Sequence, residues 1–188
     1  EAVLESDKFD TVMVSTDSPD IASVARAYNV EVYDRPASYA TEKITVLEAL
    51  LAMMEEVERH DIFAYFLPTC PLVSPDDIAD ESVDSVNSVV QYPDPIQLAM
   101  IKKEDHLIPI FDNLTAGLTN SRFIQKYFKP SGAFYMSWWD RLLENRNFFV
   151  GNIKGHEMPP ERCVDIDSLM DIRYAELVMK TSREIQNG

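Results

Sequence analysis

Cysteine is scarce in this sequence, with Cys70 and Cys163 the two among 188 residues. Two cysteines cannot build the disulfide framework that small secreted proteins use, so a reducing compartment is expected. Long apolar runs are also lacking, and none approaches the roughly 20 residues that a membrane-spanning helix needs. No stretch resembling a signal peptide comes before the first expected strand. We therefore expect a cytoplasmic protein that does not interact with a membrane.

Basic charge and glycine are also in short supply. The 17 lysines and arginines face 32 aspartates and glutamates, which gives a formal net charge of −15. This balance argues against a nucleic-acid partner, because a phosphate backbone needs a basic surface. The negative electrostatic field of such a chain repels anions, so an anionic substrate would need local cations or a metal ion at its binding site. Eleven prolines against five glycines favour ordered turns over flexible linkers.

The first third of the chain predicts an α/β fold. A buried strand is expected over residues 9–16, and Ser18 with Pro19 forms a typical helix start. A second strand follows at residues 30–33. Because β–α–β units with short connections place their strands in parallel, we expect helices on both faces of a mostly parallel sheet.

The rest of the chain predicts one domain, residues 1–188, interrupted by an excursion at residues 92–131. That excursion contains two short antiparallel strands, and we leave open whether it packs on a partner subunit or is a local insertion. Further helices are expected at residues 45–59, from Ser74, and at 138–144 and 169–181, and further strands at 62–67, 85–90, 133–136, 148–150, 153–157 and 163–167.

The stretch Cys163-Val164-Asp165-Ile166-Asp167 is the most distinctive in the chain. Side chains alternate along a strand, so Asp165 and Asp167 would point the same way and repel each other. A divalent cation relieves that repulsion, and hard oxygen ligands suit Mg²⁺, which could then grip a nucleotide phosphate. Alternatively, Asp167 or Ser168 caps the following helix and Asp165 is solvated.

A second candidate segment is Pro68-Thr69-Cys70-Pro71-Leu72, directly after the expected strand 62–67. Its two prolines exclude both a helix and a central strand, so it is a rigid loop at a strand's carboxyl end. Open α/β sheets bind ligands at that edge. Cys70 in this loop is either a nucleophile or a small packing residue, and the absence of a nearby histidine favours packing.

Several motifs occur together in a defined order. They are Val14-Ser15-Thr16-Asp17-Ser18, Arg35-Pro36, Ala40-Thr41, Pro68-Thr69-Cys70-Pro71-Leu72, Ser131-Gly132-Ala133-Phe134-Tyr135, Met158-Pro159, and Val164-Asp165-Ile166-Asp167 with Asp171. In this order and spacing the chain resembles the acylneuraminate cytidylyltransferases, also called CMP-sialic acid synthetases, over nearly its whole length.

The resemblance implies a Rossmann-like nucleotidyltransferase fold and the reaction of CTP with a nonulosonic (nine-carbon, sialic-acid-like) sugar acid to give a CMP-sugar and pyrophosphate. It implies that Asp165 and Asp167 are Mg²⁺ ligands and catalytic residues. It further implies a homodimer formed through an excursion such as residues 92–131.

Other site residues follow from the same resemblance. Arg35, Ala40 and Thr41 would bind the nucleotide, although Arg35 could instead hold a loop carbonyl. Thr69 and Gly132 would line the sugar or nucleotide site. The cations of the excursion would reach the partner's sugar carboxylate, with a solvated cationic face as the alternative; they are Arg122, Lys126 and Lys129.

The sequence departs from the family pattern at two places that bear on activity. The basic, glycine-rich loop with which the family begins is not found, so we expect impaired catalysis and an exposed sheet edge beside residues 11–16. Leu67, Cys70 and Val73 stand where the family usually has Gln, Ser and Arg. Lost hydrogen-bonding side chains change which sugar is accepted, which favours legionaminic or pseudaminic acid over ordinary sialic acid.

Two other functions fit the same residues. One is a metal-dependent glycosyltransferase of the GT-A type, whose D-x-D motif holds a metal and a nucleotide sugar, although that motif usually lies mid-chain. The other is a catalytically inactive member of the family that binds or dimerises. Pyrophosphate release from CTP separates the first from a cytidylyltransferase, and CTP binding without turnover identifies the second.

Overall fold

The computed structural model describes residues 1–78 and 84–187. Within them, no helix is both long and apolar enough to cross a bilayer. The helices are α1 (Ala2–Glu5), α2 (Pro19–Ala27), α3 (Val46–Met54), α4 (Trp139–Asn145) and α5 (Leu169–Asn187). The strands are β1 (Met13–Thr16), β2 (Glu31–Asp34), β3 (Ile62–Phe66), β4 (Ser85–Gln91), β5 (Met100–Lys103), β6 (His106–Pro109), β7 (Phe128–Trp138) and β8 (Ile153–Glu157).

Local sequence signals fix the starts of the early helices. The Ser18 side chain accepts a hydrogen bond from the Ile21 N–H, and Pro19 opens α2 as predicted. Thr45 and Glu48 form a reciprocal capping box at the start of α3. That helix ends at Met54, earlier than expected, because acidic residues follow it and its last turn has no basic residue. Negative charge at a helix C-terminus opposes the helix dipole.

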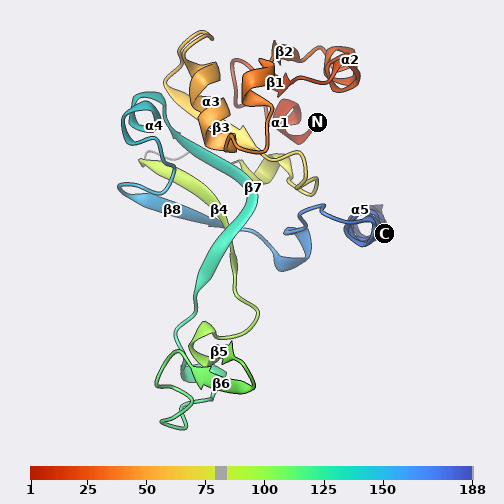
Figure 1. Ribbon diagram of the computed structural model, residues 1–188. Coiled ribbons are helices and arrows are strands. Elements are labelled where there is room, and N and C mark those ends of the chain that lie inside the picture. The colour runs from red at the N-terminus through yellow and green to blue at the C-terminus, as the bar shows by residue number, and fades with distance from the viewer. Residues whose placement is uncertain (79–83, 188) are drawn as a thin grey trace.

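The main sheet is mixed, which corrects the expectation of a mostly parallel layer. Its strand order is β3-β7-β4-β8, and β7 runs antiparallel to both of its neighbours. The reason is connectivity, because β4 leads out to the excursion and β7 leads directly back beside it (Figure 1). Parallel pairing occurs between β4 and β8 and between β1 and β2, which form a separate two-stranded sheet.

A pronounced bulge interrupts β7 where it passes β4. Asn87 pairs with Tyr135 while Val89 pairs with Pro130, so β7 uses extra residues over the same length. The fully buried Ser88 lies opposite the bulge, and its hydroxyl accepts from the Phe134 N–H and donates to the Phe134 carbonyl, both at 2.9 Å. A bulge re-aims the backbone, and here it turns Gly132 out of the ladder with φ +85°.

Each face of β3 packs into its own hydrophobic cluster. On one face Phe63 packs with α3 and α4 residues such as Leu51 and Trp139. On the other face Ala64 packs against a cluster that includes Phe134 and Met158. Successive residues of one strand therefore enter different clusters, as alternation of side chains requires.

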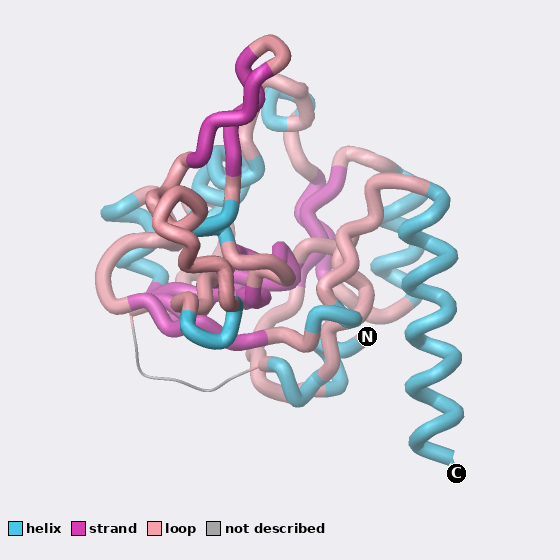
Figure 2. The backbone as a smooth tube through the Cα atoms, turned by 90° about the horizontal axis from the view of Figure 1, so that it is seen from below, coloured by secondary structure: helices cyan, strands magenta, loops and turns pink. Residues whose placement is uncertain are grey.

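The excursion at residues 92–131 extends away from the main sheet, and Figure 1 shows the hairpin β5–β6 at its far end. The view in Figure 2 shows the same hairpin projecting from the rest of the chain. Large apolar side chains are exposed here, including Leu107 at 61% and Phe123 at 87%. The two short antiparallel strands are confirmed.

Three sequence predictions of secondary structure are wrong or incomplete. Residues 148–150 form bends rather than a strand, and residues 163–167 are irregular. The segment from Ser74 forms only a 3-10 turn at Pro75–Asp77 within the described residues, and residues 79–83 of the expected helix lie outside them. Residues 163–167 lie directly after the 3-10 turn Pro160–Arg162 and shortly before α5, so little length is left for them to pair as a strand.

Candidate active site

The Asp-Ile-Asp segment lies against the loop that follows β3. The Ile166 N–H donates a 2.9 Å hydrogen bond to the Thr69 carbonyl. Val164 is buried and packs with Leu72, and Ile166 is half-buried. Asp165, between Val164 and Ile166, is exposed, and so is Asp167, which follows Ile166. The segment is therefore extended with both carboxylates facing outward, although it forms no regular strand.

Gly132 closes the other side of the same loop. A Cβ atom at Gly132 would lie 3.4 Å from the Cys70 sulfur, and the φ of +85° already disfavours any side chain there. Cys70 is 4% exposed. Burial, together with the nearby Asp165 carboxylate, raises the pKa of the Cys70 thiol to about 11. The thiol therefore stays protonated near neutral pH, which supports packing rather than nucleophilic chemistry.

Two tyrosines that the sequence reasoning missed lie beside these residues. Tyr65 and Tyr135 are a cross-strand pair of β3 and β7, with stacked rings 6.3 Å apart between centroids. Burial raises the pKa of both phenols, and the Asp165 carboxylate contributes to both shifts. The positive charge of Arg35 opposes the rise in the pKa of Tyr65, so the guanidinium acts electrostatically on that phenol. Half-buried polar aromatics at the end of β3, just before the rigid loop, were the available signal.

Arg35 is held at the carboxyl end of β1. Its backbone N–H donates to the Thr16 carbonyl at 2.9 Å, and its guanidinium lies 3.3 Å from the Asp17 carboxylate. The Arg35 Nε atom is buried and has no hydrogen-bond partner within the described residues. A buried donor without a partner is unfavourable, so the Arg35 side chain carries an unsatisfied group at this end of β1.

Asp171 determines the backbone next to the carboxylate pair. Its carboxylate accepts from the N–H and hydroxyl of Ser168, each at 2.7 Å, and from the Asp167 N–H at 3.2 Å. These bonds lower the pKa of Asp171. The Ser168 carbonyl accepts from the Ile172 N–H, so Ser168 is the residue that caps α5. The capping role thus falls to Ser168 with Asp171, which leaves the Asp167 side chain exposed.

The carboxylate pair fits Mg²⁺ as a partial site. No cluster of three or more His, Cys, Asp or Glu able to hold a metal occurs in the described part of the chain. Mg²⁺ in phosphoryl-transfer sites is usually held by one or two carboxylates, with substrate phosphates and water completing its shell. Two exposed aspartates supply that minimal donor set, and the assignment of Mg²⁺ to Asp165 and Asp167 stays a prediction.

Comparison with known proteins identifies the family. A family model described as Cytidylyltransferase matches residues 1–104, which is more than half of the chain. The chain belongs to this cytidylyltransferase family.

Individual relatives extend the similarity along the chain. The chain is 27% identical over 183 residues to the N-acylneuraminate cytidylyltransferase of Escherichia coli O18:K1:H7, a match that covers 93% of the chain and 43% of that relative. It is 24% identical over 196 residues to the pseudaminic acid cytidylyltransferase of Campylobacter jejuni serotype O:2, covering 98% and 84%. It is 24% identical over 200 residues to the CMP-N,N'-diacetyllegionaminic acid synthase of Legionella pneumophila, covering 97% and 84%. The chain thus spans less than half the length of the Escherichia coli relative.

The remaining predicted site residues of this family member are exposed on loops and on the excursion. Ala40 and Thr41 are exposed in the loop after the 3-10 turn Ala37–Tyr39. The three cations of the excursion are exposed, and Lys129 lies 6.0 Å from the centroid of the Tyr92 ring; they are Arg122, Lys126 and Lys129. The roles predicted for all five stay predictions.

A cluster of polar side chains around Asp77 holds the segment that follows the post-β3 loop. Arg162 makes two hydrogen bonds to the Asp77 carboxylate, one of them 2.7 Å from Nη2 to Oδ1. The Ser74 N–H donates to the same carboxylate at 2.7 Å, and His156 lies 3.4 Å away. Burial opposes ionisation of Asp77, but the bonds from Arg162 and Ser74 outweigh it and lower its pKa to about 2. This cluster ties residues 74–77 to the segment that leads into the Asp-Ile-Asp stretch.

Proposed function

We propose that this chain catalyses transfer of CMP from CTP to a nonulosonic acid, a nine-carbon 2-keto sugar acid, with release of pyrophosphate. The observation that carries the proposal is the Ile166–Thr69 hydrogen bond, which sets two outward carboxylates at the carboxyl end of β3. Family membership supports the reaction class. The names of the relatives, which specify N-acylneuraminate, pseudaminic acid and diacetyllegionaminic acid, support the sugar class.

In the proposed reaction, the anomeric hydroxyl of the sugar acid attacks the α-phosphorus of CTP. A new O–P bond forms as the bond from the α-phosphorus to the pyrophosphate oxygen breaks. One of the carboxylates, Asp165 or Asp167, accepts the hydroxyl proton, and the pair would hold the Mg²⁺ ion. Bound Mg²⁺ would offset negative charge on the phosphate oxygens. Arg35 binds the nucleotide with Ala40 and Thr41, and Thr69 and Gly132 line the sugar or nucleotide site.

We further propose that the sugar is less hydroxylated than ordinary sialic acid. Gly132 lies beside Cys70 and Leu67, because a Cβ there would come within 3.4 Å and 4.0 Å of their side chains. Neither side chain offers the strong hydrogen bonds that an amide or hydroxyl would. A site without such partners loses its preference for substrate hydroxyl groups. Pseudaminic or legionaminic acid therefore fits the site beside Leu67 and Cys70 better than ordinary sialic acid does.

The test is a pyrophosphatase-coupled phosphate assay with CTP, MgCl₂ and a panel of three sugar acids: N-acetylneuraminic, pseudaminic and N,N'-diacetyllegionaminic acid. We expect phosphate release with one of the last two and CMP-sugar in the products. CTP binding by calorimetry with no release for any sugar would instead support an inactive binding member. Transfer from a nucleotide sugar without pyrophosphate release would support a glycosyltransferase.

We propose that residues 92–131 mediate a homodimer. The exposed apolar side chains of this excursion, such as Ile101 at 48% and Leu107 at 61%, support a covered surface in the assembly. Replacing residues 99–121 by a short Gly-Ser linker keeps the β4–β7 ladder, which ends at the Gln91–Phe128 pair. Light scattering should then show a monomer where the parent chain is a dimer, and an unchanged dimer would refute this assignment.

A further inference from the structure

Arg162 ends the 3-10 turn that directly precedes the Asp-Ile-Asp segment. Its side chain is 25% exposed, and its guanidinium bonds to three residues that follow β3. Nη1 donates to the Leu72 carbonyl at 3.4 Å and to the Ser74 hydroxyl at 3.1 Å. Nη1 and Nη2 also donate to the two carboxylate oxygens of Asp77, at 2.5 Å and 2.7 Å. One side chain therefore joins the approach to the carboxylate pair to the chain that follows β3.

Further contacts follow at every second residue of the same segment. Val164 packs with Leu72 in a buried cluster, and Ile166 packs against that cluster. The Ile166 N–H donates to the Thr69 carbonyl at 2.9 Å. As the chain advances from Arg162 to Ile166, its contacts move backward along the post-β3 loop. The two segments therefore lie side by side and run antiparallel.

Because side chains alternate along an extended chain, these contacts determine where the carboxylates point. Residues 162, 164 and 166 face the loop, so Asp165 and Asp167 face away from it and are exposed. Apolar contact alone does not select this alternation, because Cys163 also packs against a buried cluster. A shift of one residue would exchange the two faces and turn the carboxylates inward. The hydrogen bonds of Arg162 are directional and charge-assisted, so they select the observed register.

The acceptor of these bonds is itself held in place. The Asp77 side chain is 6% exposed, so water competes little for its carboxylate. The Ser74 N–H and hydroxyl donate to one oxygen of that carboxylate, at 2.7 Å and 2.8 Å. His156 of β8 lies 3.4 Å from the other oxygen. Arg162 is therefore bound to a group that does not follow the segment when the segment shifts.

We propose that Arg162 is a positioning residue for the Asp-Ile-Asp segment, and that its forked bonds to Asp77 fix the register that turns Asp165 and Asp167 outward. It acts through the backbone of residues 163–166 and not by contact with the substrate. This inference deepens the proposed function and rests on it for the roles of the two carboxylates.

The first test is Arg162→Lys, which keeps a positive charge beside Asp77 but replaces the planar fork by a point charge. Amide hydrogen exchange of the 188-residue chain is followed by NMR. Exchange at Ile166, whose N–H bonds to Thr69, should become faster by roughly tenfold more than exchange at Leu67. Leu67 is the internal reference, because its N–H bonds to β7 and reports the stability of the sheet.

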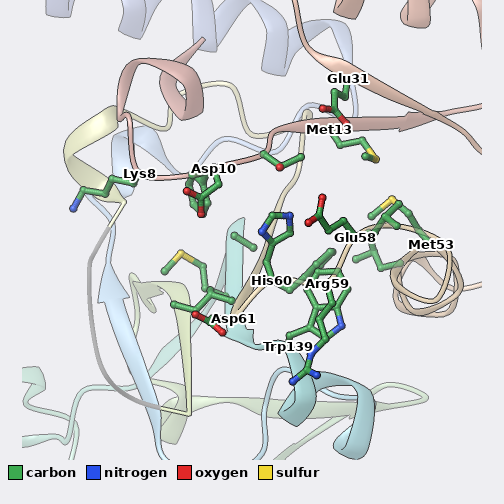
Figure 3. A pocket seen from close by; sticks show the side chains of 18 of the residues that line it. Lys8, Asp10, Met13, Glu31, Met53, Glu58, Arg59, His60, Asp61 and Trp139 are labelled. Atoms are coloured by element: carbon green, nitrogen blue, oxygen red, sulfur yellow. The ribbon is translucent and has the colours of Figure 1, made fainter.

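Arg59→Lys is the matched control. Arg59 bonds to the Asp140 carboxylate, and both side chains are more exposed than those of the Arg162 pair, at 67% and 69%. It lies at a different place, among the lining residues of a pocket that includes His60 and Trp139 (Figure 3). This variant should leave exchange at Ile166 and turnover as in the parent chain.

The coupled phosphate assay gives a second measurement on the same variants. The kcat of Arg162→Lys should fall about tenfold or more, because a displacement of about 1 Å misaligns reacting groups. The KM for CTP should stay close to that of the parent chain, because the residues proposed to bind the nucleotide follow β2, away from Arg162. A fold that is merely less stable would instead lower the melting temperature without a selective change at Ile166.

A second variant, Asp77→Asn with Arg162→Gln, removes both charges together, so that no unpaired charge is left buried. It should show the same selective increase in exchange at Ile166. Parent-like exchange at Ile166, or equal increases at Ile166 and Leu67, would overturn the positioning role whatever the activity. If exchange changes as expected but the parent chain releases no phosphate with any sugar acid, the register role stands and the proposed function is overturned.

Discussion

The sulfur of Cys70 lies 3.4 Å from the position that a side-chain carbon of Gly132 would take. Two segments far apart in the sequence, the loop after β3 and the bulge of β7, therefore lie so close together that an added Cβ at Gly132 would touch the Cys70 sulfur. The nucleotide and sugar roles proposed for Thr69 and Gly132 depend on this approach.

Gly132→Ala is expected to destabilise the fold and to lower turnover. The left-handed φ of +85° costs about 1–2 kcal/mol for a residue with a side chain, and the added Cβ would lie 3.4 Å from the Cys70 sulfur, at the edge of ordinary contact. Urea unfolding and the coupled assay measure the two effects. Gly117→Ala is the matched control, because its φ of +69° is similar and nothing lies within 4 Å. Equal losses in the two variants would show that the Cys70 contact contributes nothing.

Asp167→Asn is expected to abolish Mg²⁺-dependent phosphate release while the melting temperature stays unchanged. The side chain is exposed and its carboxylate serves no capping bond, so only the proposed cation and proton roles are lost. Asp171→Asn is the control, since that carboxylate caps α5 and its loss should lower the melting temperature without eliminating turnover. Full activity of Asp167→Asn would remove the metal assignment.

Ser88→Ala is expected to destabilise the chain by about 1–3 kcal/mol, because it leaves buried backbone groups of Phe134 without their partner. Ser85→Ala provides a close comparison on the same strand. The Ser85 hydroxyl is equally buried but has no hydrogen-bond partner within the described residues, so its removal should be neutral or stabilising. Chemical denaturation of both variants measures the difference, and similar losses would contradict the bridging role of Ser88.

Stability should fall between about pH 4 and pH 2 through Asp77. Its pKa in the folded chain is about 2 against an ordinary 3.8, so the unfolded chain takes up the proton first as the pH falls. The stabilisation is therefore fully present above pH 4 and amounts to about 2 kcal/mol. A carbon-detected NMR titration should place the Asp77 midpoint near pH 2. Arg162→Gln should raise that midpoint, and an unchanged value would show that Arg162 is not responsible.

Much of the local structure could be predicted from the sequence because its signals are local. Ser18-Pro19 starts α2, and the apolar run before Pro68 forms β3 as expected. The mixed sheet could not be predicted in this way, since the direction of β7 depends on how the excursion returns. The bulge opposite Ser88 likewise depends on a contact between distant strands.

The residues of the candidate site likewise fall into those that sequence motifs predicted and those that depend on contacts between distant strands. Asp165, Thr69 and Gly132 were expected from motifs, and the structure brings them together through Ile166 and Cys70. The stacked pair Tyr65 and Tyr135 was missed, because cross-strand stacking between β3 and β7 requires their pairing to be known. Sequence motifs identify the residues that the chemistry requires. The residues that surround them can be identified only once the pairing register of β3 and β7 is known.

Val164, which precedes the first carboxylate, packs against Leu72 and against Ala175 of α5. The position of the carboxylates relative to β3 thus depends on whether the last helix stays docked, and over residues 169–182 Ala175 is the one fully buried residue of that helix. We expect α5 to set the upper working temperature of the enzyme. Residual activity after heating should therefore be lost several degrees below the unfolding of the main sheet seen by circular dichroism, and coincident midpoints would show that the helix and sheet melt as one unit.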